Sequence, residues 1–225
     1  MIIAIDGPAG AGKSTVAKEV ARRLKLLYID TGAMYRALTL KAIFNKIDIK
    51  DEEALVAMAR DSRIELKETS SSLKIYLDGR EVTQQIREPR VTKFVSEISQ
   101  IASLRRIMVE LQRQAVRDNK GAVLEGRDIG TVVFPQADYK FYLDADFKER
   151  VRRRFKEFKA LEKEISLEEV EQDILKRDYI DSTRQCAPLR KAEDAIYIDT
   201  THMSIEEVVD KILSYINLDV DKLKN

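Results

Sequence analysis

The chain has little of what builds a disulfide-stapled, zinc-binding or membrane-spanning protein. Its 225 residues include one cysteine, one histidine and no tryptophan. A single cysteine, Cys186, excludes an internal disulfide framework and a cysteine-rich zinc site. No apolar run approaches the length that crosses a membrane, and no signal peptide is visible before the first motif. We therefore expect a cytoplasmic protein without a membrane partner.

An excess of charge of either sign is also missing. Lysine and arginine together number 40, aspartate and glutamate 39, and the net charge is +1. Proteins dedicated to nucleic acids or membrane surfaces carry a surplus of positive charge, so we expect no nucleic-acid partner. The length allows one domain or two small ones, and no repeat or low-complexity linker divides the chain. We expect a single domain spanning residues 1–225.

The first motif lies close to the start of the chain. Residues Gly7–Ser14 match the phosphate-loop pattern G-x-x-x-x-G-K-[ST]. The apolar run Ile2–Ile5 before the loop suits a buried strand, and the spacing of Val16 and Val20 indicates an amphipathic helix after it. Because strand, glycine-rich loop and helix follow in that order, the motif has the structural context that it requires.

The residue types in this loop suit the binding of a nucleoside triphosphate. Glycines let backbone N–H groups turn inward around phosphate oxygens, and the following helix N-terminus adds partial positive charge. Lys13 can reach the β- and γ-phosphates, and the hydroxyl of Ser14 can hold Mg²⁺. We predict ATP as the phosphoryl donor and Mg²⁺ as the cofactor. The predicted ATP-binding residues of the loop are Gly7, Pro8, Ala9, Gly10, Ala11, Gly12, Lys13, Ser14 and Thr15.

Helical and strand-like segments alternate along the rest of the chain, which is typical of an α/β protein with a mostly parallel sheet. Further strands are expected at 26–29, 122–124, 139–143 and 195–199. Helices are expected at 34–45, 51–60, 91–119 with a break near 99–103, 146–160, and after capping boxes at Ser166 and Ser204. Two strand-like pieces, 64–67 and 73–77, flank a serine-rich turn and predict a small antiparallel insertion in about 63–88.

Arginines recur beside turns and helix edges in three separated segments. Arg36 comes soon after the second predicted strand, and Arg127 directly follows a later one. Arg177 and Arg184 belong to R-D-Y-I-D-S-T-R at the end of a predicted helix. The carboxyl ends of parallel strands share one edge, and guanidinium groups suit bidentate phosphate binding. The set predicts a second anionic ligand beside the loop, although a surface ion pair is the alternative for any single arginine.

Several stretches together resemble the bacterial-type cytidylate kinase family, within the nucleoside monophosphate kinases. The stretches are IDGPAGAGKST, YIDTGAMYRALTL, SQIA followed by LRRIMVELQR, LEGRDIGTVVFPQADYKFYLDA, and RDYIDSTRQCAPL. They spread over nearly the whole chain. The resemblance implies a three-layer P-loop NTPase fold with a central parallel sheet, a monophosphate-binding insertion near 63–98 and a lid near 148–187. It also implies a monomer that transfers the γ-phosphate of ATP to CMP or dCMP, without a covalent enzyme intermediate.

The resemblance further implies a role for individual residues. Arg36, Arg127 and Arg184 match residues that hold the monophosphate, and with Lys13 they form the predicted catalytic set. Among the other predicted residues, those that contact CMP are Thr31, Ser99, Arg105, Asp128, Arg177 and Asp181, and a lid arginine that contacts ATP is Arg154.

The chemistry of cytosine supports part of this assignment. Its exocyclic amine is a donor that suits the carboxylate of Asp128, and its O2 and N3 atoms accept hydrogen bonds from Arg105 and Ser99. For Asp128 the other interpretation is a salt bridge to Arg127, which could hold together with base reading, and for Arg105 the rival is Arg106.

Other acidic and basic residues leave alternatives open. Glu125, Asp30 and Asp6 could orient Mg²⁺ through water or hydrogen-bond to the loop. The basic run 150–156 fits a lid, a solvated helix face or a nucleic-acid patch. A shikimate-like kinase and a nucleotide-dependent regulatory or nucleic-acid-binding module are the rival functions, and the arginine-rich acceptor motifs disfavour both.

Overall fold

A five-stranded parallel sheet forms the centre of the computed structural model, in the order β2-β6-β1-β7-β8. The structure describes residues 1–68, 73–117, 119–160 and 164–222, with side chains up to residue 216. The strands are β1 (Ile2–Asp6), β2 (Leu27–Asp30), β6 (Ala122–Gly126), β7 (Tyr139–Asp144) and β8 (Ile196–Asp199). The carboxyl ends of all five strands therefore meet at one edge, as the sequence predicts.

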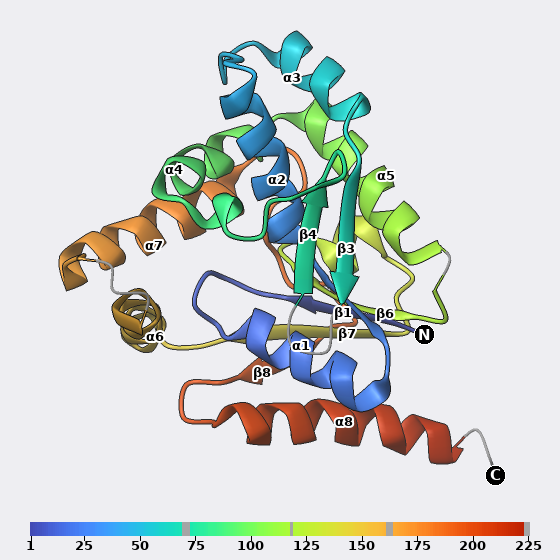
Figure 1. Cartoon of the computed structure of the whole chain (residues 1–225). Coiled ribbons are helices and arrows are strands. Elements are labelled where there is room, and N and C mark those ends of the chain that lie inside the picture. The colour runs from blue at the N-terminus through green and yellow to red at the C-terminus, as the bar shows by residue number, and fades with distance from the viewer. Residues whose placement is uncertain (69–72, 118, 161–163, 223–225) are drawn as a thin grey trace.

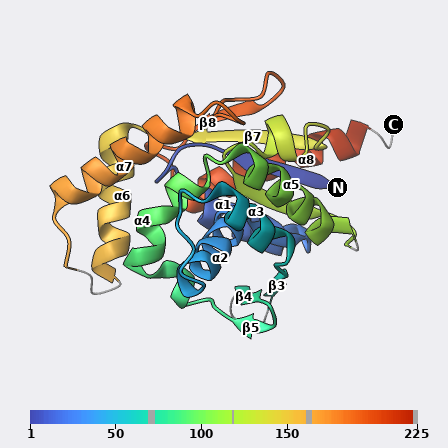
Figure 2. The same cartoon turned by 90° about the horizontal axis from the view of Figure 1, so that it is seen from above.

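Helices cover both faces of this sheet (Figures 1 and 2). On one face α1 (Lys13–Leu24) and α8 (Ile205–Lys222) pack on Ile3 and Ile5 of the central strand. The other face lies under α2 (Thr31–Phe44), α3 (Glu52–Arg60) and α5 (Ala102–Arg117), which bury Ala4 of the same strand. Alternate residues of β1 thus serve opposite cores, which is why the strand is apolar from Ile2 to Ile5. The predicted three-layer α/β class is confirmed.

Local signals explain where the helices begin. Ser166 and Glu169 form the predicted capping box at the start of α7 (Leu167–Thr183), with N–H to oxygen distances of 3.1 and 2.8 Å. Helix α2 begins at Thr31, three residues before the predicted start, because the carboxylate of Asp30 caps it by accepting the N–H of Ala33 at 2.8 Å. The helix predicted over 91–119 is divided, as expected, into α4 (Pro89–Ile98) and α5.

A small antiparallel sheet lies beside α2. It consists of β3 (Ile64–Glu68), β4 (Leu73–Leu77) and β5 (Arg80–Glu81), followed by the short helix η1 (Gln85–Arg87). Ile75 and Leu77 pack against α2 in a separate apolar cluster. The serine-rich turn predicted between β3 and β4 lies outside the described residues.

Two helices near the carboxyl edge of the sheet, α6 (Phe147–Ala160) and α7, are called the lid helices below. They pack on each other through Val151, Val170 and Ile174, a cluster separate from both main cores. Helix α7 also lies beside α4, so the insertion and the lid helices face the same side of the sheet (Figure 2). Among the described residues, no helix is both long and apolar enough to cross a membrane.

Candidate active site

A cavity of about 310 Å³ opens at the carboxyl edge of the sheet, between the phosphate loop, α2, α4 and the lid helices. Most of the predicted site residues line it: Ala9, Gly10, Gly12, Lys13, Ser14, Thr15, Thr31, Arg36, Ser99, Arg105, Arg127, Asp128, Arg154, Arg177, Asp181 and Arg184. The other three, Gly7, Pro8 and Ala11, belong to the loop but do not line the cavity. Segments far apart in sequence therefore converge on one space.

Side chains from other segments donate hydrogen bonds to carbonyl groups of the phosphate loop. Arg150 Nη1 donates to the carbonyl of Ala9 at 3.0 Å, and Thr200 Oγ1 donates to that of Ala11 at 3.4 Å. Gly7 has a φ of 149°, and a Cβ there would lie 2.0 Å from the carbonyl oxygen of Leu143. The loop can therefore approach β7 only with glycine at this position.

Lys13 lies at the base of the cavity, buried among charged groups. Its Nζ donates to the carbonyl of Pro8 at 2.6 Å. Burial, followed by the positive charge of Arg127, lowers the pKa of Lys13 to about 7, although Glu125 and Asp181 act in the opposite direction. An anion bound in the loop would restore the preference for the charged ammonium.

Ser14 and Glu125 meet beside Lys13. Ser14 Oγ donates to Glu125 Oε1 at 2.5 Å, and Tyr28 lies 3.5 Å from the same oxygen. Burial and the nearby Asp30 raise the pKa of Glu125. Oxygen groups such as a hydroxyl and a carboxylate suit Mg²⁺, so Ser14 could hold the metal and Glu125 could orient it through water. The described residues hold no cluster of three or more His, Cys, Asp or Glu that would form a metal site without a ligand.

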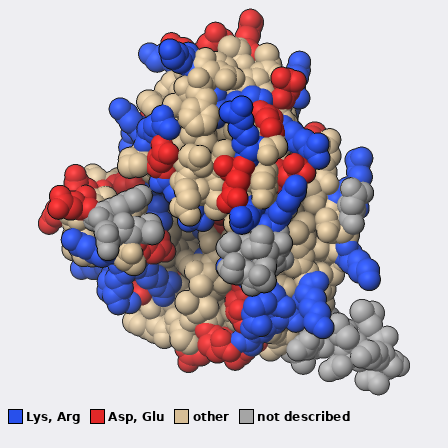
Figure 3. All heavy atoms as spheres, viewed as in Figure 1, with Lys and Arg blue, Asp and Glu red and all other residues tan. Residues whose placement is uncertain are grey.

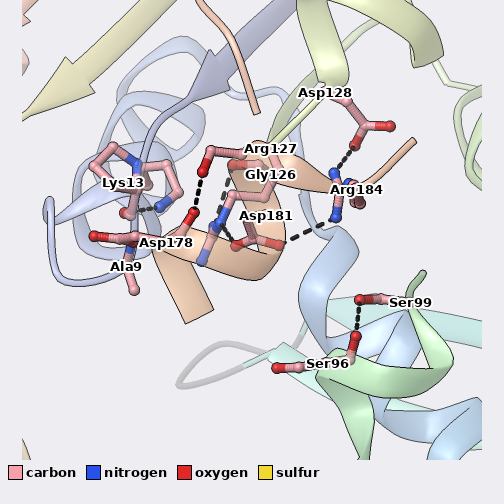
Figure 4. Close-up of polar contacts among 12 residues, drawn as sticks. Ala9, Lys13, Ser96, Ser99, Gly126, Arg127, Asp128, Asp178, Asp181 and Arg184 are labelled. Carbon is pink, nitrogen blue, oxygen red and sulfur yellow. Dashed lines mark hydrogen bonds and ion pairs between the residues drawn. The ribbon is translucent and has the colours of Figure 1, made fainter. Parts of the chain in front are cut away.

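Asp181 joins two of the predicted phosphate-binding arginines (Figure 4). Arg127 Nε donates to Asp181 Oδ2 at 2.8 Å, and Arg184 Nη1 donates to Asp181 Oδ1 at 3.1 Å. Burial alone raises the pKa of Asp181, but the two guanidinium groups lower it overall. The carboxylate therefore stays ionised and holds side by side the arginines that directly follow β6 and α7. The expectation that Asp181 contacts CMP remains a prediction, because both of its oxygens already accept hydrogen bonds within the protein.

The remaining arginines of the cavity repel one another. Arg36 donates to Thr92 Oγ1 at 2.9 Å, while Arg177 pairs with Asp173 and Arg154 with Glu157. Burial, then the charges of Arg177 and Arg154, lower the pKa of Arg36 to about 10.

A bound anion would relieve this repulsion, which is the electrostatic signature of a phosphate site. Elsewhere on the face seen in Figure 3, basic and acidic side chains are interspersed and form no broad basic patch.

Asp128 pairs with arginines from two other segments. Arg105 Nη2 lies 2.5 Å from Asp128 Oδ2, and Arg184 Nη2 lies 3.8 Å from Asp128 Oδ1. The alternative pairing of Asp128 with its neighbour Arg127 is wrong, because Arg127 pairs with Asp181. Arg105 is buried and lines the cavity, whereas its rival Arg106 is exposed. The cation of Arg105 also lies 5.4 Å from the ring of Tyr35, a second cavity residue.

Two hydroxyl groups predicted to contact CMP have partners within the protein. Thr31 Oγ1 donates to the carbonyl of Glu125 at 2.7 Å and so ties α2 to β6. Ser99 Oγ donates to the carbonyl of Ser96 at 2.9 Å (Figure 4). Each would have to exchange this bond to donate to a ligand, although its oxygen can still accept a hydrogen bond, and the assigned roles remain predictions.

The acids left open by the sequence have different positions. Asp6 Oδ1 and Oδ2 accept the N–H groups of Ile129 and Gly130, each at 2.8 Å. Asp6 therefore holds the short π-helical segment η2 (Ile129–Val133), which directly follows Arg127 and Asp128 in the sequence. Burial raises the pKa of Asp6 to about 6. Asp30 caps α2. Of the three acids, and within the described part of the chain, Glu125 alone accepts a hydrogen bond from the hydroxyl of Ser14.

Sequence reasoning missed several residues that line or support the cavity. Thr92 and Ser96 lie on the same face of α4 as Ser99, so helical spacing could have identified them. Glu157 and Phe158 line the cavity from α6, one turn after Arg154. Arg150 and Asp178 do not line the cavity but contact the phosphate loop from the lid helices, and no local signal marks such a contact. For Arg150 the solvated-face interpretation of the basic run is wrong, because this side chain is buried.

The fold and the site define a P-loop kinase whose phosphate loop faces a cavity lined by arginines. The sequence model of the family described as "Cytidylate kinase" matches residues 3–218, and the chain belongs to this family. The cytidylate kinase of Geobacillus sp. (strain WCH70) is 51% identical over 215 residues, which cover 96% of each chain. The cytidylate kinase of Clostridioides difficile (strain 630) is 49% identical over 218 residues, covering 97% of this chain and 99% of its own. The resemblance stated from the sequence is confirmed.

Proposed function

We propose that the protein transfers the γ-phosphate of ATP to CMP or dCMP, which yields ADP and CDP or dCDP. One observation carries the proposal: Lys13 of the phosphate loop and Arg36, Arg127 and Arg184 line the same cavity. A kinase that joins two anionic nucleotides must neutralise their repulsion and hold acceptor and donor in line. Family membership supports the same reaction and disfavours a shikimate-like kinase or a regulatory module.

Catalysis in this proposal rests on positioning and charge. Lys13 contacts the β- and γ-phosphates, and Arg127 and Arg184, held by Asp181, bind the acceptor phosphate. The acceptor oxygen is already a nucleophile, so no residue needs to form a covalent intermediate. Ser14 would hold Mg²⁺, with Glu125 acting through water, and the metal supplies neutralisation of phosphate charge when bound.

Arg105 and Asp128 select the base in this proposal. The carboxylate of Asp128 accepts a hydrogen bond from the exocyclic amine of cytosine, and Arg105 donates hydrogen bonds to the acceptor atoms of the ring. Uracil presents a carbonyl oxygen at the position of the amine and would face the carboxylate without a hydrogen bond. The polar face of α4 supplies the third side of this subsite.

The same proposal covers the parts of the chain around the cavity. Residues 63–98 form the monophosphate-binding region, and 148–187 form a lid over ATP in which Arg154 contacts the phosphates. We further propose a cytoplasmic enzyme that acts as a monomer, which size-exclusion chromatography with light scattering tests directly.

An acceptor panel tests the reaction. With ATP and Mg²⁺, a coupled assay should show turnover with CMP and dCMP, slower turnover with UMP, and none with shikimate. Lys13→Ala should lower kcat by about a hundredfold or more, the loss expected for a group that stabilises transition-state charge. Lys18→Ala, on the exposed side of the same helix, is the matched control.

Two outcomes would reject the proposal. Turnover with shikimate but not CMP would identify the rival kinase. Nucleotide binding without acceptor-dependent turnover, together with RNA affinity that falls steeply with salt, would identify a binding module instead.

A further inference from the structure

Two side chains that do not line the cavity contact the backbone of the phosphate loop at Ala9. Arg150 comes from α6, Asp178 from α7, and Ala9 is the third residue of the loop. Arg150 Nη1 donates to Asp178 Oδ2 at 2.5 Å and to the carbonyl of Ala9 at 3.0 Å. Asp178 Oδ1 in turn accepts the N–H of Ala9 at 3.3 Å.

This arrangement engages both backbone polar groups of Ala9 at once. Because one guanidinium and one carboxylate hold the carbonyl and the N–H of the same residue, rotation of that part of the loop would break a hydrogen bond to the ion pair. Arg150 is buried and is anchored further by its Nε donating to the carbonyl of Ala145 at 3.1 Å. The contact is therefore a rigid support and differs from a solvated surface ion pair.

The loop also packs directly on the backbone of α6. Gly10 has a φ of 79°, and a Cβ added there would lie 2.9 Å from the carbonyl oxygen of Arg150. The same residue thus supports the loop through its side chain at Ala9 and through its main chain at Gly10. The orientation of the phosphate-binding N–H groups depends on where the first turn of α6 lies.

Asp178 connects this support to the acceptor side of the cavity. On α7 it lies next to Arg177 and one turn before Asp181, which holds Arg127 and Arg184. One helix therefore carries the residue that fixes the donor loop and the residue that fixes the acceptor arginines.

We propose that Asp178 and Arg150 are positioning residues that hold the phosphate loop in its ATP-binding shape through the peptide groups of Ala9. The inference rests on the proposed function, since ATP must bind in this loop. Neither side chain contacts the ligand, so the pair acts through backbone geometry: the loop N–H groups lose their common direction when the pair is broken.

Binding measurements on the full-length protein test this role. Asp178→Asn should raise the Kd for the ATP analogue adenosine 5′-(β,γ-imido)triphosphate, measured with Mg²⁺, about tenfold. The reason is that the loop N–H groups then no longer direct their charge-assisted hydrogen bonds at the phosphates. The Kd for CMP alone should change less than about twofold, because Asp181 keeps its contacts with both arginines. Arg152→Gln, which breaks an exposed ion pair with Glu149 on the same helix, is the matched control.

The double variant Arg150→Met with Asp178→Asn removes both charges and guards against an unpaired buried charge that unfolds the protein. If the two residues act as a unit, the double variant should show the same Kd for the ATP analogue as Asp178→Asn. A lower melting temperature with unchanged affinity for the analogue would overturn the inference and leave a purely structural ion pair. If the unsubstituted protein binds no ATP analogue, the proposed function fails instead.

Discussion

Arg105 and Asp128 form a buried ion pair in which Nη2 and Oδ2 lie 2.5 Å apart and the side chains are 3% and 8% exposed. Both are predicted to read cytosine, so they already satisfy each other before a base arrives. The other carboxylate oxygen of Asp128 lies 3.8 Å from Arg184. If cytosine binds without displacing either arginine, its amine must approach the carboxylate of Asp128 from a direction that neither Arg105 nor Arg184 occupies. This requirement limits the orientations that cytosine can take in the site.

Asp128→Asn should weaken the preference for CMP over UMP. The amide keeps one acceptor but adds a donor that suits the O4 carbonyl of uracil, so we expect the ratio of kcat/KM values to fall by about tenfold to a hundredfold. Steady-state kinetics with both acceptors measure it. Asp210→Asn, at an exposed position on α8, serves as the control.

Asparagine is the informative substitution because its amide oxygen can still accept the hydrogen bond of Arg105, whereas alanine would leave that buried guanidinium with neither the charge nor the acceptor of Asp128, a loss of about 3–5 kcal/mol in the free energy of unfolding. If the CMP to UMP ratio of Asp128→Asn equals that of the unsubstituted enzyme, Asp128 does not read the base.

ATP binding should take up a proton at Lys13. Burial lowers the pKa of Lys13 to about 7 in the ligand-free protein, and the phosphates of ATP raise it again by favouring the ammonium. At pH 8 a group with a pKa of about 7 is about nine-tenths deprotonated, so uptake should approach one proton for each ATP bound. The affinity for ATP should therefore decrease as the pH rises above 7.

Calorimetry in buffers of different ionisation enthalpy measures this uptake. Lys13→Arg is the control, since its guanidinium keeps its proton at every pH of the experiment. Equal binding enthalpies in all buffers at pH 8 for the unsubstituted enzyme would show that Lys13 is already charged before ATP binds.

Gly10→Ala should impair ATP use, whereas Gly79→Ala should not. The two glycines have nearly the same backbone conformation, with φ values of 79° and 81°, so each alanine should lose roughly 1–2 kcal/mol of stability from the left-handed geometry. Only at Gly10 does the new Cβ meet another backbone, 2.9 Å from the carbonyl of Arg150; at Gly79 nothing lies within 4 Å.

Urea unfolding and the KM for ATP separate the two effects. We expect similar losses of stability from conformation and a rise in KM of about tenfold or more for Gly10→Ala alone. Equal KM values in the two variants would mean that the loop adapts to the displaced helix.

Ser99→Ala should raise the KM for CMP by about fivefold, the effect of one hydrogen bond of about 1 kcal/mol. Ser96, whose carbonyl accepts the hydroxyl of Ser99, lines the same wall of the cavity. Kinetics of Ser96→Ala therefore provide the matched comparison. An effect confined to Ser96→Ala would transfer the predicted role to that serine.

Local sequence patterns were sufficient for the phosphate loop, the capped helices and the individual strands, because each depends on neighbours within a few residues. The alternation of strands and helices indicated that the sheet is parallel. Motifs spread over the chain were sufficient to predict that Arg36, Arg127 and Arg184 lie near the phosphate loop. Their partners were not predictable. Asp6 holds the N–H of Ile129, 123 residues away, and Asp128 pairs with Arg105 in place of its neighbour Arg127. Such contacts depend on the tertiary structure, which hydrophobic periodicity and secondary-structure propensity do not predict.

The central strand has a consequence for synthesis on the ribosome. β1 is made first, but it pairs on one side with β6 and on the other with β7, whose residues span 122–126 and 139–144. The carbonyl of Leu143 that confines Gly7 and the backbone of Arg150 that confines Gly10 also come from this later half. A growing chain therefore carries the phosphate loop well before the parts that confine this loop have been made. We expect affinity for ATP to appear only after β7 and the first turn of α6 have been synthesised.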